Sequence, residues 1–295
     1  MNLLITGISG YVGRVLVERL GSKNKIYAIG RSDPGLKHIK FFVGDISNKE
    51  TLTKIASSIN INFDAIVHLA AYVPRVKDDD NLDLSTGVNV IGTKNILEVF
   101  DGRFDKFVMG SSAEVYDLSS TNGLIGESHA LGPKTYYGAT KLASEFLSLA
   151  YGYKNNTPVI ILRFSVMYGG YDPIERALPN FIQKALSGED INLFAAPTLR
   201  DYVHQEDVVQ SIVLALDSVE ANGVYNIGTG RGVSIVYAAM EIKKTTNSKS
   251  NIIEHEGTIK DVVLSIEKAR SELAYKPNFI FPDGLGDMIS SYVKR

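Results

Sequence analysis

The N-terminal end of the chain restricts the fold more than any other stretch of the sequence. Residues 3–6 form an apolar run that predicts a short buried strand, and residues 14–20 carry apolar side chains at helical spacing. The segment between them, residues 7–13, has glycine at every third position. Strand, glycine loop and helix in this order are the context that a nucleotide-binding glycine motif needs.

Each glycine of this loop has its own physical reason. Gly7 permits the tight turn, Gly10 lets backbone N–H groups approach a pyrophosphate, and Gly13 allows the helix to pack closely on the strand. The phosphates would then lie at the helix N-terminus, beside Tyr11 and Val12. A glycine-rich surface loop is the alternative, which the flanking strand and helix disfavour.

Further apolar runs predict more strands, with helical patterns between several of them. The runs are residues 25–29, 40–43, 65–71, 104–109 and 159–164. We therefore predict an α/β protein built on a Rossmann-type, doubly wound parallel sheet. After about residue 165 the alternation becomes irregular, which predicts a smaller α/β substrate-binding lobe over the carboxyl edge of the sheet.

These patterns also predict how the domains are divided. A dinucleotide-binding domain would comprise residues 1–165 with 205–230, and an interleaved substrate-binding lobe residues 166–204 with 231–282. A C-terminal helix would follow at residues 283–295.

Composition excludes several classes of function. The net charge of −2 shows no excess of basic residues of the kind that binds nucleic acid or a membrane surface. The absence of cysteine excludes disulfides and thiolate metal sites. The first apolar run is too short for a signal peptide, and none approaches a membrane span. We expect a cytoplasmic protein without a metal, and we expect His68 to be a packed strand residue.

The ends of the second and third predicted strands bear on cofactor choice. An acid commonly follows the second strand of NAD-specific folds, whereas here Gly30 is followed by Arg31, which can pair with a 2′-phosphate. This tilts the prediction from NAD toward NADP, although Arg31 could instead stack on adenine or be solvated. Asp45 could accept from the adenine amino group or cap the next helix. The small residues at the end of the fourth run would let a cofactor lie across it.

Tyr137 and Lys141 lie four positions apart, so on a helix both side chains share one face. A free phenol has a pKa near 10, and a nearby ammonium lowers it, which would let the pair move a proton during hydride transfer. A packed Tyr beside a solvated Lys is the alternative. Ser111 and Ser112, at the end of the fifth predicted strand, could hold a substrate hydroxyl or cap a turn. The run from Lys77 to Asp80 predicts a solvated turn or helix start.

Taken together, the motifs resemble the extended short-chain dehydrogenase/reductases that modify nucleotide sugars. The resemblance rests on the glycine loop, Gly44-Asp45-Ile46, His68-Leu69-Ala70-Ala71, Asn89 with Gly92-Thr93, residues 111–116, Tyr137 with Lys141, Leu162-Arg163-Phe164, residues 200–204 and residues 225–228. It covers nearly the whole chain and implies an NAD(P)-dependent enzyme.

The resemblance implies a role for each matching residue. Tyr137 would be the general acid/base, Lys141 would bind the nicotinamide ribose, and Ser112 would hold the reacting sugar hydroxyl. Arg200 would bind the nucleotide diphosphate, with Arg176 as a possible second arginine. The remaining implied contacts are to the cofactor from Asp45, Ile46, Leu69, Ala70, Ala71, Ser111 and Phe164, and to the nucleotide base from Phe194.

Without the resemblance, Arg200 could equally be a surface arginine paired with its neighbour Asp201. Three other positions depart from the family pattern. Val166 stands where an Asn is common in the loop after Arg163. Ala113 replaces the Asp of the dehydratase branch while Glu114 remains, which disfavours 4,6-dehydration. Gly30 and Arg31 replace the usual ribose-binding acid.

Three functions follow from these residues. The first is a nucleotide-sugar epimerase that works by transient oxidation at C4, and the second is an NADPH-dependent reductase of a 4-keto nucleotide sugar. The third is a catalytically idle dinucleotide-binding sensor, against which the intact Ser112, Tyr137 and Lys141 argue. The family usually forms homodimers, here through residues 89–100 and 136–151.

Overall fold

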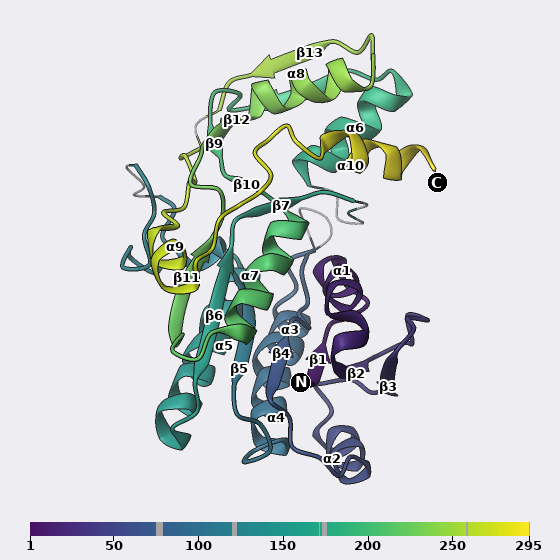
Figure 1. Ribbon diagram of the computed structural model, residues 1–295. Coiled ribbons are helices and arrows are strands. Elements are labelled where there is room, and N and C mark those ends of the chain that lie inside the picture. Colours follow the sequence, from purple (N-terminus) through teal and green to yellow (C-terminus); the bar gives the residue numbers. More distant parts are fainter. Residues whose placement is uncertain (75–78, 120–122, 171, 173–175, 258, 295) are drawn as a thin grey trace.

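The computed structural model describes residues 1–74, 79–119, 123–170, 172, 176–257 and 259–294 (Figure 1). Its centre is a parallel sheet of seven strands in the order β11-β6-β5-β4-β1-β2-β3. The strands are β1 (Asn2–Thr6), β2 (Lys25–Gly30), β3 (Ile39–Val43), β4 (Ala65–His68), β5 (Phe107–Ser112), β6 (Val159–Phe164) and β11 (Gly223–Ile227). The predicted Rossmann-type fold is confirmed.

Alternate residues of each strand face opposite layers, because side chains of a strand point to its two faces in turn. Leu3 and Ile5 pack with α1 (Tyr11–Leu20), α7 (Gln205–Asp217) and α9 (Glu267–Leu273), while Leu4 packs with α2 (Lys49–Ser58) and α4 (Gly92–Val99). The long helix α5 (Tyr136–Asn155) lies on the α4 side, against β5 and β6. Both faces of the sheet are thus covered, which explains the continuous apolar runs.

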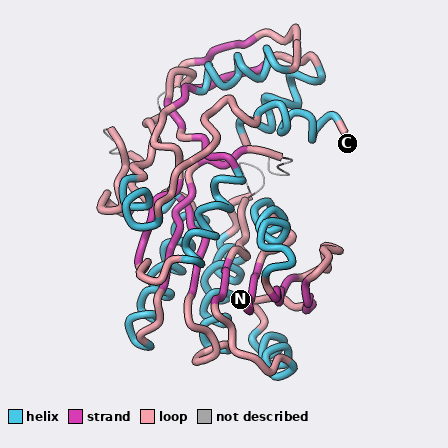
Figure 2. The backbone as a smooth tube through the Cα atoms, in the orientation of Figure 1, coloured by secondary structure: helices cyan, strands magenta, loops and turns pink. Residues whose placement is uncertain are grey.

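A smaller lobe lies above the carboxyl ends of the strands, as Figures 1 and 2 show. It has its own apolar core around Tyr168, Phe181 and Phe281. Three short ladders pair β7 (Val166–Tyr168) with β10 (Tyr202–His204), β8 (Ile191–Phe194) with β13 (Ile252–His255), and β9 (Leu199–Arg200) with β12 (Val233–Ser234). Its helices are α6 (Ala177–Ser187), α8 (Ile235–Thr245) and α10 (Leu285–Val293). The interleaved domain division stays a prediction.

Several boundaries differ from the sequence prediction. The fourth strand ends at His68 rather than at residue 71, and the fifth runs to Ser112, which brings both serines into the strand end. The chain before β5 is divided into α3 (Leu82–Ser85), a π-helical segment η2 (Thr86–Ile91) and α4, so the predicted dimer segment 89–100 begins within η2. Two short 3-10 turns occur as well, η1 (Gly21–Lys23) after α1 and η3 (Ala113–Val115) after β5. No described helix is long and apolar enough to cross a membrane.

His68 is a buried residue of β4, as predicted. Its ring nitrogens lie 2.8 Å from the Thr6 hydroxyl and 3.0 Å from the Thr93 hydroxyl, so one threonine accepts and the other donates when the ring is neutral. Burial, followed by the nearby Lys141 ammonium, lowers the pKa of His68 to about 3. The folded chain therefore holds this imidazole neutral.

This burial predicts a loss of stability in mild acid. The unfolded chain takes up a proton on His68 below its ordinary pKa of 6.5 while the folded chain does not, so stability falls as pH drops from 6.5 toward 3. The contribution approaches about 1.4 kcal/mol per pH unit. Urea unfolding at pH 7.5, 6, 5 and 4 should show a shallower pH dependence for His68→Gln than for the wild type. Parallel curves would contradict the assignment.

Candidate active site

The glycine loop joins β1 to α1 at the carboxyl edge of the sheet. Gly7 has φ +78°, and a Cβ there would lie 2.5 Å from the backbone nitrogen of Ala70, just beyond β4. A Cβ on Gly13 would collide with the Gly7 carbonyl oxygen. Gly10 stands at the helix N-cap and offers no side-chain acceptor to the first N–H groups of α1. The loop thus fits the pyrophosphate of a dinucleotide, which binds where a helix presents such N–H groups.

The Tyr11 side chain leaves this loop and reaches the smaller lobe. Its hydroxyl donates a hydrogen bond to the Gly169 carbonyl, directly after β7. Burial and the Asp172 carboxylate raise the pKa of this phenol. Val12, the next residue, is buried, so the groups that these two residues can offer a phosphate are their backbone N–H groups at the start of α1.

At the predicted adenine end, the structure decides one of the alternatives for Asp45. Asp45 is not the cap of α2, because Asn48 accepts from the Thr51 N–H in that position. Asp45 instead accepts hydrogen bonds from the backbone and hydroxyl of Ser47, at 2.8 and 2.7 Å. Ile46 is buried, and Arg31 is exposed beyond the end of β2.

The structure places Tyr137 and Lys141 in the first turns of α5, with Ser112 nearby at the end of β5. The nearby Ser112 hydroxyl lowers the pKa of Tyr137. The Ser112 hydroxyl also accepts from the Glu114 N–H at 3.2 Å, so Ser112 caps η3 as well. Tyr137 itself is partly buried.

The electrostatics of Tyr137 differ from the expectation. Burial raises the pKa of Tyr137 to about 12, and the Glu114 carboxylate also raises it, while Arg176 and Ser112 lower it. The prediction of a lowered pKa is therefore wrong for the protein alone. The loss of water around the phenol raises its pKa by more than the neighbouring positive charges lower it.

Lys141 is only 3% exposed. Burial lowers the pKa of Lys141 to about 8, and the Glu145 carboxylate opposes that change. Among the described residues no hydrogen bond involves this ammonium, whose nitrogen retains some accessible surface although the residue as a whole is buried. The hydroxyl groups of a ribose are acceptors of the kind that this ammonium lacks, so it fits the sugar of a bound dinucleotide.

Ser111 does not point its hydroxyl into the expected cofactor position. It is buried and donates to Glu145 Oε1 at 2.5 Å. The Arg163 guanidinium holds the same carboxylate from two nitrogens, with its shortest contact at 2.6 Å, and lies over the Tyr116 ring. Phe164 is buried beside Gly110.

The substrate side holds the two predicted arginines in different settings. Arg176 precedes α6, and its positive charge lowers the pKa of both Tyr11 and Tyr137. Arg200 is partly buried and donates to the carbonyl oxygens of Leu199 and Lys260, each at 2.9 Å. The alternative of a pair with Asp201 is wrong, because that carboxylate is turned to other partners.

Asp201 is completely buried and accepts from the Thr229 hydroxyl and from the backbone N–H groups of Thr229, Gly230 and Leu264. Phe194 is 61% exposed and stacks on His255, with ring centroids 4.8 Å apart.

Two residues of this neighbourhood were missed by the sequence interpretation. Glu145 lies four positions after Lys141, a helical spacing that could have revealed it. Asp80 had no such signal. It lies just before α3, in keeping with the predicted helix start, but its partly buried carboxylate also accepts from the backbone of α5, a contact that the sequence did not indicate. Lys77 and Asp78 of the same run lie outside the described residues.

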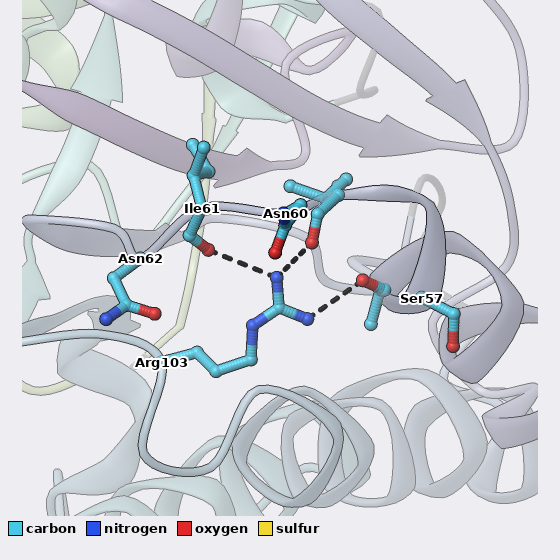
Figure 3. Close-up of a pocket in the computed structure, with 7 residues that line it drawn as sticks. Ser57, Asn60, Ile61, Asn62 and Arg103 are labelled. Carbon is cyan, nitrogen blue, oxygen red and sulfur yellow. Dashed lines mark hydrogen bonds between the residues drawn. The ribbon is translucent and has the colours of Figure 1, made fainter.

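A surface hollow of about 480 Å³ lies elsewhere, near the amino ends of the strands. Figure 3 shows Arg103 pointing toward backbone oxygens at the end of α2, where it donates to Ala56 at 2.8 Å, to Ile61 at 3.1 Å and to Ile59. Its guanidinium thus completes a helix end rather than a ligand site. No cluster of three metal-ligating side chains occurs in the described ranges.

Comparison with known proteins agrees with this geometry. The chain is 30% identical over 265 residues to the trifunctional UDP-glucose 4,6-dehydratase/UDP-4-keto-6-deoxy-D-glucose 3,5-epimerase/UDP-4-keto-L-rhamnose-reductase RHM3 of Arabidopsis thaliana, covering 82% of this chain and 39% of that protein. It thus spans about two fifths of the length of the first curated relatives it matches.

Two other similar proteins match over nearly their full lengths. The dTDP-glucose 4,6-dehydratase of Actinoplanes sp. is 25% identical, covering 99% of this chain and 98% of that protein. The structure of the Thermus thermophilus UDP-glucose 4-epimerase in complex with NAD superposes with a TM-score of 0.87 at 25% identity, covering 99% of each chain.

The family model matches residues 3–228, which include the glycine loop, both serines, Tyr137, Lys141 and Arg200. This match extends over more than half of the chain. It confirms both the resemblance inferred from the motifs and the expectation of an NAD(P)-dependent enzyme. The chain belongs to the NAD dependent epimerase/dehydratase family.

Proposed function

We propose that this enzyme is a nucleotide-sugar 4-epimerase that oxidises C4 transiently. The observation that carries the proposal is the grouping of Ser112, Tyr137 and Lys141 at the carboxyl edge of the sheet, the edge that also holds the glycine loop. In open α/β sheets this edge is where ligands bind. A phenol, an ammonium and a hydroxyl are the groups needed to move a proton from a sugar hydroxyl.

Tyr137 takes the proton of the 4-hydroxyl as the sugar is oxidised and returns it after the 4-keto sugar has turned in the site. Bound NAD would accept the hydride from C4 and give it back to the opposite face of the 4-keto sugar, and its oxidised nicotinamide ring would bring a positive charge. Because the pKa of Tyr137 is about 12 in the protein alone, added positive charge is required for it to act as a base at neutral pH. Lys141 supports the phenolate, and Ser112 holds the hydroxyl by hydrogen bonding.

The proposed cofactor contacts follow the geometry of the loop. Gly7, Gly10 and Gly13 shape the phosphate site, with the backbone of Tyr11 and Val12, and Lys141 meets the nicotinamide ribose. The other proposed cofactor residues lie at or just beyond strand ends, namely Arg31, Asp45, Ile46, Leu69, Ala70, Ala71, Phe164 and, through its backbone only, Ser111.

The substrate is proposed to be a nucleotide diphosphate sugar, the class named for the relatives. Arg176 and Arg200 would hold the diphosphate because guanidinium groups match its charge and geometry. The exposed ring of Phe194 would lie against the base. A firm hold on the nucleotide and a loose hold on the sugar suit an epimerase, whose sugar must turn.

Two observations bear on rival activities. Ala113, a buried methyl side chain after Ser112, cannot protonate a leaving hydroxyl, which disfavours 4,6-dehydration although Glu114 is close to Tyr137. The exposed Arg31 at the end of β2 favours the second candidate, an NADPH-dependent reductase of a 4-keto nucleotide sugar, because an exposed guanidinium can meet a 2′-phosphate.

Replacing the phenol tests the catalytic assignment. Tyr137→Phe should lower kcat by about 10²- to 10⁴-fold, the usual contribution of general acid–base catalysis, while the melting temperature and dinucleotide binding stay near wild type. Tyr136→Phe is the matched control, because that neighbouring phenol is 48% exposed and outside the proposed site. Activity would be followed with UDP-glucose and dTDP-glucose. Undiminished turnover in Tyr137→Phe would exclude Tyr137 as the acid/base, and with it the proposed function.

The bound dinucleotide separates epimerase from reductase. Mass spectrometry after denaturing the purified protein should find about one NAD per chain, since an epimerase regenerates its cofactor at every turnover. That result would also remove the 2′-phosphate role proposed for Arg31. An empty site that binds NADPH better than NADH would overturn the epimerase in favour of the reductase.

A homodimer is proposed through α4 and α5 with their neighbouring turns. α4 packs on α5, and exposed apolar side chains lie on α5 and on the two segments before α4, namely Phe146 and Leu147 of α5, Ile91 of η2, and Leu82 and Leu84 of α3. Covering such a surface with a second copy removes apolar area from water. Light scattering at assay concentration should give twice the chain mass, and a monomer would reject the dimer.

A further inference from the structure

The carboxylate of Asp80 contacts the start of α5, the helix that carries Tyr137. It accepts hydrogen bonds from the backbone N–H groups of Tyr136, at 2.7 Å, and of Tyr137, at 3.0 Å. The partners are 56 and 57 residues apart in sequence, so the contact belongs to the fold and not to local chain geometry. One carboxylate therefore holds the main chain of the tyrosine proposed as acid/base.

This contact is additional to the usual N-cap of the helix. Thr135 already caps α5, accepting from the Gly138 N–H at 3.0 Å. Asp80 adds a full negative charge at the positive end of the helix dipole and binds the two N–H groups that Thr135 leaves. The first turn of α5 is thus fixed by two side chains, one local and one from the segment that follows β4.

The segment that carries Asp80 is itself attached to α5 one turn further along. Asn89 of η2 accepts from the Tyr72 N–H at 2.7 Å and donates to the Tyr72 carbonyl. The same Asn89 amide donates to the Thr140 hydroxyl at 3.0 Å. Two bridges, through Asp80 and through Asn89, therefore connect the chain after β4 to the turn of α5 that separates Tyr137 from Lys141.

We propose that Asp80 is a positioning residue for Tyr137, which it holds through the backbone at the start of α5. This inference rests on the proposed function, since it assigns Asp80 a part in the same proton transfer. Proton transfer requires heavy atoms within about 2.6–3.2 Å, and a misplacement of about 1 Å can lower a rate about a hundredfold. A carboxylate with two acceptors fixes both the place and the direction of the first turn.

The test compares Asp80→Ala and Asp80→Asn with Asn81→Ala. Asn81 is the matched control because it is the next residue and also a helix cap, but of α3, where it accepts from the Leu84 N–H at 3.0 Å. With UDP-glucose and dTDP-glucose as probes, Asp80→Ala should lower kcat at least tenfold and leave KM within about threefold. Asp80→Asn keeps one acceptor and should fall between it and the wild type, whereas Asn81→Ala should keep kcat within twofold.

A second measurement does not depend on turnover. Hydrogen–deuterium exchange at the amides of Tyr136 and Tyr137 should become faster in Asp80→Ala and stay unchanged in Asn81→Ala. A kcat within twofold of wild type for Asp80→Ala, or an equal loss in Asn81→Ala, would overturn the inference. Failure of the proposed function itself would be seen separately, as full turnover in Tyr137→Phe.

Discussion

The ion pair between Glu145 and Arg163 is the interaction on which the arrangement of the site depends. Its side chains are 1% and 4% exposed, and they join α5 to β6, while Ser111 ties the same carboxylate to β5. Charges buried this deeply are stable only when paired, and removing one partner of such a pair typically costs about 3–5 kcal/mol. The helix that carries Tyr137 is therefore fixed on the sheet by a contact that leaves little freedom in its rotation or height.

This pair also accounts for the charge of Lys141. Burial alone favours the neutral amine, and the Glu145 carboxylate one turn along the helix opposes that tendency. With a pKa of about 8, the side chain is still mainly protonated at neutral pH. The same carboxylate thus has a mechanical and an electrostatic role, and the positive charge beside the expected nicotinamide ribose depends on both.

Features that depend on nearby sequence could be predicted well. The order of strand, glycine loop and helix was readable from residues 3–20, and the spacing of Tyr137 and Lys141 gave their common helix. Contacts between distant segments could not be predicted, which is why the hydrogen bonds from the start of α5 to Asp80 were missed. The pKa of Tyr137 was misjudged because spacing reveals a neighbouring charge but not the water lost on folding. The role of Asp45 stayed open because Asp and Asn, here Asn48, can both cap a helix.

Asp201 has a consequence for how substrate preference can change in this fold. Its buried carboxylate accepts hydrogen bonds from backbone N–H groups of the chain after β11 and of Leu264. Asp201 directly follows Arg200 in the sequence. The backbone at Arg200 is therefore held in place by these hydrogen bonds of its neighbour. If Arg200 holds the diphosphate as proposed, loops that touch the sugar or the base can vary in sequence while this arginine keeps its place.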